Sequence, residues 1–205
     1  MKLIGRLFLA LALLGFASSL QAGEHTKGGD KGKNSMQKAQ ADLYDFISIN
    51  QILMWISNNG STSHNPLTDG SGLEWPNGSG KYAIFQDGLV WGGRVQGEIR
   101  IGGSTYSQGL QAGNIKGDGT ADPSDPIHRV FKVRKVSKAQ FALMPADQQA
   151  RLRKDFEEWP TQFEAPYTDA DNDGQYNPDF DAWLDGGNVD SPWFIGDEVL
   201  WFVSN

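Results

Sequence analysis

Residues 82–103 read YAIFQDGLVWGGRVQGEIRIGG, and they indicate the fold class more clearly than any other stretch. Three runs rich in β-branched and aromatic residues, at 82–85, 89–91 and 94–101, follow one another at hairpin spacing. An Asp-Gly turn separates the first two runs, and a glycine pair separates the next two as a bulge or bend. The stretch therefore predicts three short antiparallel strands.

Further strand patterns lie on both sides of this stretch. Residues 46–49 and 52–56 are rich in β-branched and aromatic residues, and the second run offers apolar side chains to both faces, which is typical of a central strand. Residues 73–76 predict one short edge strand. Residues 129–136 alternate in the manner of a strand, and residues 198–204 form a final apolar strand pattern.

One helix is expected. Residues 147–159 contain strong helix formers and place Leu152, Phe156 and Trp159 on one side, and a capping-box pattern begins at Ser137. The long segments between the strand patterns are polar and rich in glycine. The sequence therefore predicts a mainly β fold, an antiparallel sandwich-like domain with long glycine-rich loops and one helix.

The first 22 residues have the three parts of an export leader. A basic end precedes the apolar run 7–16, and the leader closes on Ala22, after which we expect cleavage. The apolar run is too short for a permanent transmembrane helix, and an uncleaved membrane anchor is the alternative. The predicted organisation is a signal peptide at 1–22, a flexible polar linker at 23–41 and a β-rich domain at 42–205. We expect an extracellular or outer-membrane-surface location, with the periplasm as the alternative.

The composition narrows the function classes. The formal net charge is −7 at pH 7, and an acidic surface repels phosphate backbones but attracts divalent cations. Nucleic acid is therefore not an expected partner. The chain has no cysteine, which excludes disulfides, thiolate zinc sites and cysteine nucleophiles.

The strongest chemical motif is the acidic run DADNDGQYNPDFD at residues 169–181. Acids stand at loop positions 1, 3 and 5, and the glycine at position 6 allows the chain to reverse. Calcium takes about six to eight oxygen ligands, and this spacing directs carboxylates to the inside of a tight turn. The predicted ligands of one Ca²⁺ ion are Asp169, Asp171, Asp173, Gln175 through its carbonyl, Asn177, Asp179 and Asp181.

The loop departs from the EF-hand pattern at its end. Position 12 is Phe180 rather than glutamate, so a bidentate ligand must come from Asp179 or Asp181, or from outside the loop, for example from Asp185. Prolines before and within the loop argue against a helix on each side of it. The alternative without metal is an acidic surface turn held by its own side chains.

Two other functions have weaker support. Trp75, Trp183 and Trp193 stand beside turn residues, where an exposed indole could stack on a sugar ring in a carbohydrate-binding module, although core packing is the commoner role.

A secreted hydrolase fragment would need two facing carboxylates. The acids considered for such a pair are Glu74, Asp87, Glu98, Glu157 and Glu158. No spacing brings two of them together, and the three histidines form no catalytic or zinc pattern, so we do not expect an enzyme.

Several segments together resemble the N-terminal region of large secreted or surface proteins, mostly uncharacterised, of gliding or type IX-secreting Gram-negative bacteria. The segments are GSGK at 78–81, FQDGLVWGG at 85–93, GSTY at 103–106, EWP at 158–160, APY at 165–167, the acidic loop, and GDEVLWFVSN at 196–205. The resemblance covers residues 49–205. It implies a surface or adhesion-like protein, and the acids at 169, 171 and 173 match its loop, but it supplies no catalytic residues.

The resemblance also implies more chain than this sequence contains. The related proteins continue with further strands and often a C-terminal sorting domain, whereas the last strand pattern here ends at Asn205 with no loop after it. We therefore expect a fragment of a longer protein. The function predicted from the whole sequence is a secreted, calcium-stabilised structural or adhesion-like surface module, with cell-surface polysaccharide or other protein domains as its partners.

Overall fold

The computed structural model describes residues 43–205 except 104, 107–109 and 121. The predicted signal peptide at 1–22 and the linker at 23–41 lie outside the described residues. In the described part of the chain most regular structure is strand, arranged in several antiparallel sheets, so the predicted mainly β fold is confirmed. Three α-helices occur there instead of the single helix expected. None of the helices in that part has the length and apolar character to cross a bilayer.

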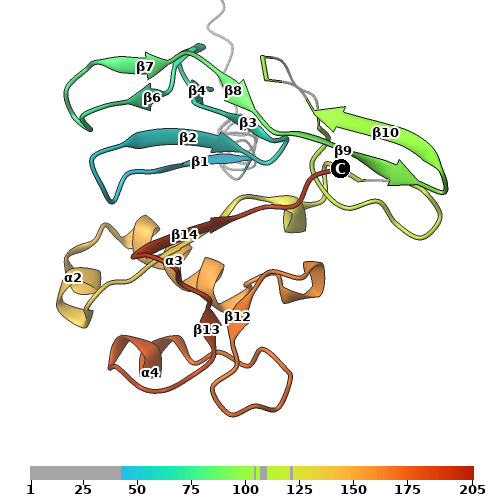
Figure 1. The fold of residues 1–205 in the computed structure, drawn as a ribbon. Coiled ribbons are helices and arrows are strands. Elements are labelled where there is room, and N and C mark those ends of the chain that lie inside the picture. The colour runs from blue at the N-terminus through green and yellow to red at the C-terminus, as the bar shows by residue number, and fades with distance from the viewer. Residues whose placement is uncertain (1–42, 104, 107–109, 121) are drawn as a thin grey trace, which may run out of the picture.

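A sheet region occupies the first part of the described chain (Figure 1). Its six-stranded antiparallel sheet has the order β7-β6-β2-β3-β8, and β1 pairs with β2. The strands are β1 (Tyr44–Ile47), β2 (Leu53–Ser57), β3 (Ser61–Thr62), β6 (Leu73–Glu74), β7 (Tyr82–Ile84) and β8 (Asp87–Gly88). A small hairpin, β4 (His64–Asn65) with β5 (Gly70–Ser71), lies between β3 and β6 in the chain.

The central strand of this sheet is the one that the sequence predicts. β2 pairs with β1, β3 and β6, and Ile56 is its one buried residue. The predicted edge strand at 73–76 was wrong, because β6 lies between β2 and β7. Proline at position 76 has no N–H for a sheet, which explains why the strand is short but says nothing about its neighbours.

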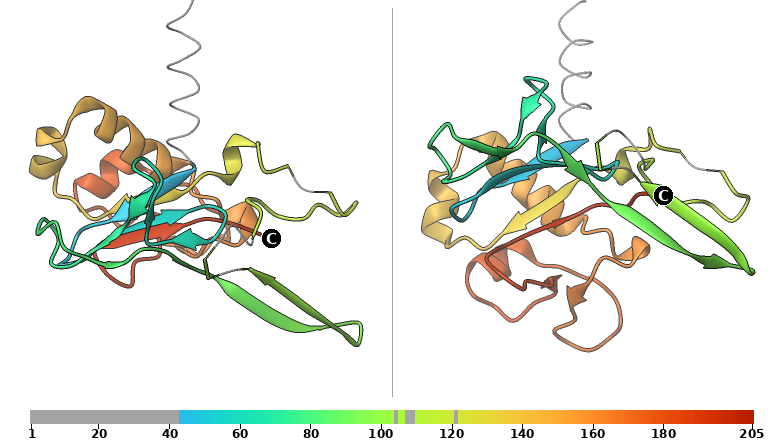
Figure 2. Two further views of the ribbon diagram at one scale, coloured as in Figure 1. Left: turned by 90° about the horizontal axis from the view of Figure 1, so that it is seen from above. Right: turned by 45° about the horizontal axis from the view of Figure 1, so that its top comes forward.

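A long hairpin projects away from the sheet region (Figure 2). It consists of β9 (Val90–Val95) and β10 (Glu98–Gly103), which pair in register across a turn at Gln96 and Gly97. Both turn residues have positive φ, 53° and 89°, as a two-residue turn that follows strand twist requires. The predicted single strand at 94–101 was therefore wrong, and the glycine pair before it lies inside β9 rather than at a bend.

A mixed region holds most of the core, below the sheet region in Figure 1. Its elements are the short 3₁₀ helices Pro126–His128 and Thr161–Phe163, the pair β11 (Phe131–Arg134) with β14 (Glu198–Trp201), the pair β12 (Tyr167–Thr168) with β13 (Ser191–Pro192), and the helices α2 (Lys138–Leu143), α3 (Ala146–Glu157) and α4 (Phe180–Leu184). The buried apolar cluster is Phe131, Val133, Leu152, Phe156, Trp159, Ala165 and Phe180.

Local sequence signals account for α2 and α3. Ser137 and Gln140 form the predicted capping box at the start of α2. Leu152, Phe156 and Trp159 are buried together, as the helical spacing predicts. The chain leaves α3 before proline 160, and its apolar side packs on β11 to make the core.

The final strand has more neighbours than its sequence suggests. Beyond β14, the backbone of Asn205 exchanges two hydrogen bonds with Gln111, and Gly113 donates to the carbonyl of Val203. These contacts pair residues 203–205, after which the sequence has no further loop, with a segment from the loop before β11.

Candidate metal centre

The β12–β13 pair brings together two distant parts of the acidic segment. Tyr167 lies opposite Pro192 and Thr168 lies opposite Ser191. The next step in this antiparallel register brings Asp169, at the start of the loop, close to Asp190, just before β13. In Figure 1 the loop that leaves β12 forms the lower end of the molecule.

Three carboxylates converge at this point. Asp169, Asp171 and Asp190 each place an oxygen so that all three lie within 4.8 Å of one another. Asp190 is buried with 3% exposure, Asp169 is half-buried and Asp171 is exposed. Carboxylate oxygens are hard ligands, so the donor set suits a hard cation rather than a soft metal.

Asp190 also holds the loop together. One of its oxygens accepts the backbone N–H of Ala170 at 2.8 Å, and the other accepts that of Asn177 at 3.0 Å. These bonds join both ends of the loop to the strand that follows. Sequence reasoning missed Asp190, because it lies outside the acidic run and only the β12–β13 register places it near Asp169.

The turn itself has the form that the spacing predicts. Asp169 accepts the backbone N–H groups of Asp173 at 3.2 Å and Gly174 at 2.9 Å, so the chain wraps around this carboxylate. Gly174 has a φ of 78°, in the left-handed region that favours glycine. Asn172 has a φ of 61°, which asparagine tolerates better than most residues.

The other predicted ligands within the turn form hydrogen bonds with one another. Asp173 accepts the N–H of Gln175 at 2.7 Å and the amide of Asn177 at 3.3 Å. Asp173, Gln175 and Asn177 therefore lie beside the three-carboxylate group, in the same turn.

The remaining predicted acids lie elsewhere. Asp179 caps α4 by accepting the N–H of Ala182 at 2.9 Å. Asp181 is in the first turn of that helix and accepts hydrogen bonds from both terminal nitrogens of Arg153, at 3.0 and 2.6 Å. Asp185, considered as an outside ligand, pairs with a lysine of α2 at 2.6 Å. The structure brings none of these three into the group.

The electrostatics of the loop are those of crowded negative charge. Loss of solvation raises the pKa of Asp171; the N–H of Asp173 opposes this, and the charges of Asp173 and Asp190 add to it. The pKa of the Tyr167 hydroxyl is also raised, first by desolvation and then by the charges of Asp169, Asp190 and Asp173. A bound cation would offset this repulsion.

The tryptophans considered for sugar binding belong to different sheets of the fold or to its core. Trp75 is 59% exposed and Trp193 is 52% exposed, but they follow β6 and β13, which lie at opposite ends of the view in Figure 1. Trp183 is half-buried and packs on Phe156 and Phe194, with ring centroids 4.8 and 6.3 Å away.

The acids considered for hydrolysis mostly have structural partners. Glu74 is buried and accepts a backbone N–H from the glycine at position 80, and Asp87 accepts the hydroxyl of a threonine in β3. Glu157 and Glu158 pair with arginines at 3.4 and 3.1 Å. Glu98 lies in the projecting hairpin. In the described residues, none of these contacts joins two of the five acids.

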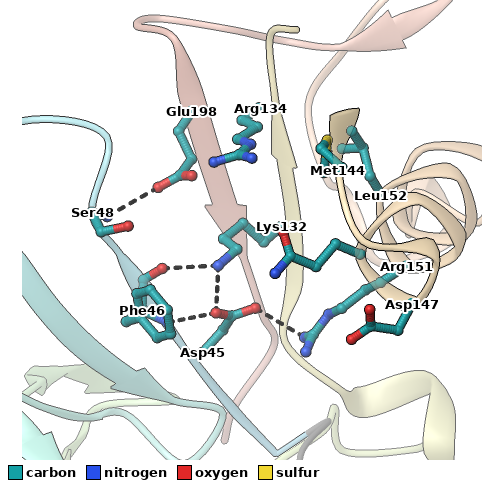
Figure 3. A pocket seen from close by; sticks show the side chains of 11 residues that line it. Asp45, Phe46, Ser48, Lys132, Arg134, Met144, Asp147, Arg151, Leu152 and Glu198 are labelled. Carbon is teal, nitrogen blue, oxygen red and sulfur yellow. Dashed lines mark hydrogen bonds and ion pairs between the residues drawn. The ribbon is translucent and has the colours of Figure 1, made fainter. Parts of the chain in front are cut away.

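A cavity of about 440 Å³ lies between the sheet region and the mixed region (Figure 3). It is lined by Asp45, Phe46, Ser48, Lys132, Arg134, Met144, Asp147, Gln148, Arg151, Leu152 and Glu198. Figure 3 shows Asp45 between Lys132 and Arg151, both of which bind it, while Glu198 accepts the N–H of Ser48 at 3.4 Å. Opposite charges across the cavity thus tie the two regions together.

Comparisons with known proteins add no relative. No protein family, no curated protein and no solved structure matches the chain.

Proposed function

We propose that this chain is an exported structural or adhesion-like surface module whose acidic loop is ordered by a calcium ion. The observation that carries the proposal is the convergence of Asp169, Asp171 and Asp190 from a glycine-hinged turn and the facing strand. Because position 12 of the loop is not a glutamate, the ion needs a ligand from outside the loop, and Asp190 takes this role.

The loop geometry favours a cation over a turn that is stable alone. Three carboxylates within 4.8 Å repel one another, and their internal N–H contacts neutralise only part of that charge. Calcium tolerates irregular oxygen sets, so carbonyls of the loop and water can complete the ligands. The ion would supply charge neutralisation and a fixed loop shape rather than chemistry on a substrate.

Two contacts connect this loop to the core, so fixing the loop would also fix the elements beside it. The hydroxyl of Tyr176 donates to the carbonyl of Phe156 at 2.6 Å, and Phe180, which follows the loop directly, is buried in the core. A calcium-bound loop would therefore hold α4 against α3. Export agrees with the leader pattern in residues 1–22 and with the resemblance to secreted surface proteins, and the partners we propose are cell-surface polysaccharide or other protein domains.

The test is calorimetric titration of calcium, with thermal melts in calcium and in chelator. We expect binding heat and a rise in Tm of roughly 5–10 °C at a calcium concentration about 100 times Kd. Asp171→Asn should abolish both effects, because Asp171 is exposed and its loss removes a ligand without disturbing packing. Asp181→Asn is the matched control, since it changes an exposed acid in the first turn of α4, outside the group, and should leave binding heat unchanged.

Two results would contradict the proposal. The first is identical melting in calcium and chelator with no binding heat, which leaves an acidic turn held by its own N–H groups. The second is equal loss of binding in both variants, which would show diffuse attraction to an acidic surface instead of a site.

A further inference from the structure

The β9–β10 hairpin exposes an unusual amount of apolar surface. Val90, Ile99 and Ile101 are 61%, 70% and 80% exposed, and the register places all three on one face. Two-stranded hairpins are marginally stable in water by themselves. The hairpin projects from the molecule (Figure 2), and among the described residues β10 pairs with no strand except β9.

The free edge of β10 is well defined. Val95 and Glu98 flank the two-residue turn and lie opposite each other, so they form the first hydrogen-bonded pair of the hairpin. Because these pairs alternate along an antiparallel ladder, Ile99 and Ile101 direct their N–H and C=O groups away from β9. Neither proline nor lysine protects this edge, which is therefore open to another strand.

The charges on this edge are complementary to themselves. Glu98 and Arg100 flank Ile99, both are exposed, and neither forms an ion pair with another described residue. When two copies of β10 pair antiparallel about a two-fold axis at Ile99, each Glu98 lies opposite Arg100 of the second copy. This pair falls in the non-hydrogen-bonded position, where facing side chains are closest.

We propose that β10 is a self-association edge, and that two copies of the chain join through it about a two-fold axis at Ile99. The two hairpins then form a four-stranded sheet in which the exposed isoleucines of both copies lie side by side. An axis at Arg100 would instead place two arginines opposite each other. The edge of β9 has a lone charge, Arg94, and no complementary partner for it.

The register is tested by charge reversal and sedimentation of the full chain. We expect a concentration-dependent dimer for the wild type, and a dimer constant weakened roughly tenfold or more by Glu98→Arg and by Arg100→Glu, because each puts like charges opposite twice. The double variant Glu98→Arg with Arg100→Glu restores both pairs and should recover the dimer. A monomeric wild type, or a double variant no better than the single ones, would overturn the proposal.

Cross-linking gives a second readout in a chain without cysteine. At the axis, Ile99→Cys places two thiols on facing residues about 5.5 Å apart between Cα atoms, within disulfide range. Ile101→Cys is the matched control, because it faces residue 97 of the second copy rather than itself. Mild oxidation should give covalent dimer for Ile99→Cys only. Equal cross-linking of both variants would show nonspecific collision and would contradict the register, and monomer carrying a different bound partner would contradict the self-association.

Discussion

At the scale of single residues, a carboxylate of this chain takes its properties from the groups that the fold places beside it. A hydrogen bond from Arg153 lowers the pKa of Asp181, although that acid belongs to the same acidic run as Asp171, whose pKa is raised. Asp190 is buried and takes part both in the loop framework and in the acidic group. The same residue type therefore serves as cap, ion-pair partner or candidate ligand.

Glu198 gives a pH-dependent prediction at this scale. Burial raises its pKa above the ordinary 4.5, and the nearby charge of Lys132 opposes that shift. The folded state then binds more protons than the unfolded state above pH 4.5, so the contribution of Glu198 to stability is complete below that pH and is lost as pH rises through the folded pKa. Urea unfolding between pH 4 and pH 7 should show the wild type losing stability relative to Glu198→Gln. A difference that stays constant or grows with pH would contradict the assigned cause.

At the scale of elements, α3 organises the core because its apolar side meets both β11 and α4. The ring of Phe156 is fully buried and lies 5.3 Å from that of Phe180, and Phe131 and Trp159 complete an edge-to-face pair at 6.2 Å. Aromatic pairs of this kind add to the stabilisation from burial alone. The helix thus connects the strand pair to the segment that carries the acidic loop.

Removal of one ring tests this role. Phe156→Ala should lower the free energy of unfolding by about 3–5 kcal/mol, because it leaves a cavity among rigid aromatic neighbours. Leu143→Ala, at an 86% exposed position in α2, is the control and should stay within about 0.5 kcal/mol. Chemical denaturation measures both. Similar losses in the two variants would mean that α3 does not organise the core.

At the scale of the whole molecule, the sheet region depends on the mixed region. Among the described residues, Ile56 is the one buried apolar side chain that the sheet region supplies. The connection between the regions is largely polar: Asp45 binds Lys132 and Arg151, and the amide of Asn58 donates to the carbonyl of His128 at 2.8 Å. The sheet should therefore open more readily than the core.

Asp45→Asn tests the connection. It removes a 6% exposed carboxylate from two cations that remain 21% and 33% exposed, so we expect a loss of about 2 kcal/mol, below the cost of breaking a fully buried pair. Hydrogen exchange should become faster in β1 and β2 while α3 changes little. Asp147→Asn, an exposed acid beside the same cavity, is the control. Equally faster exchange in β2 and α3 would show that the two regions unfold as one unit.

Local pattern was sufficient for part of this protein. The alternation at 129–136, the helical spacing at 147–159 and the glycine-hinged turn at 174 each depend on neighbours within a few residues, so the chain itself specifies them. The mainly β fold follows from the same short-range signals. The turn at 96–97 also depends on neighbouring residues. The glycine pair at 92–93 is an equally plausible end for a strand, however, and only the pairing of β9 with β10 shows where the chain turns.

Tertiary structure decided which of these local pieces meet. The β12–β13 register places Asp190 close to Asp169, whereas Asp179 caps α4 and Asp181 pairs with Arg153. β6 is an internal strand because β7, which follows it in the chain, pairs with its second edge. Spacing along a sequence encodes which groups share a turn or a face, but contacts between distant segments depend on strand register and packing, and these are set by the fold as a whole.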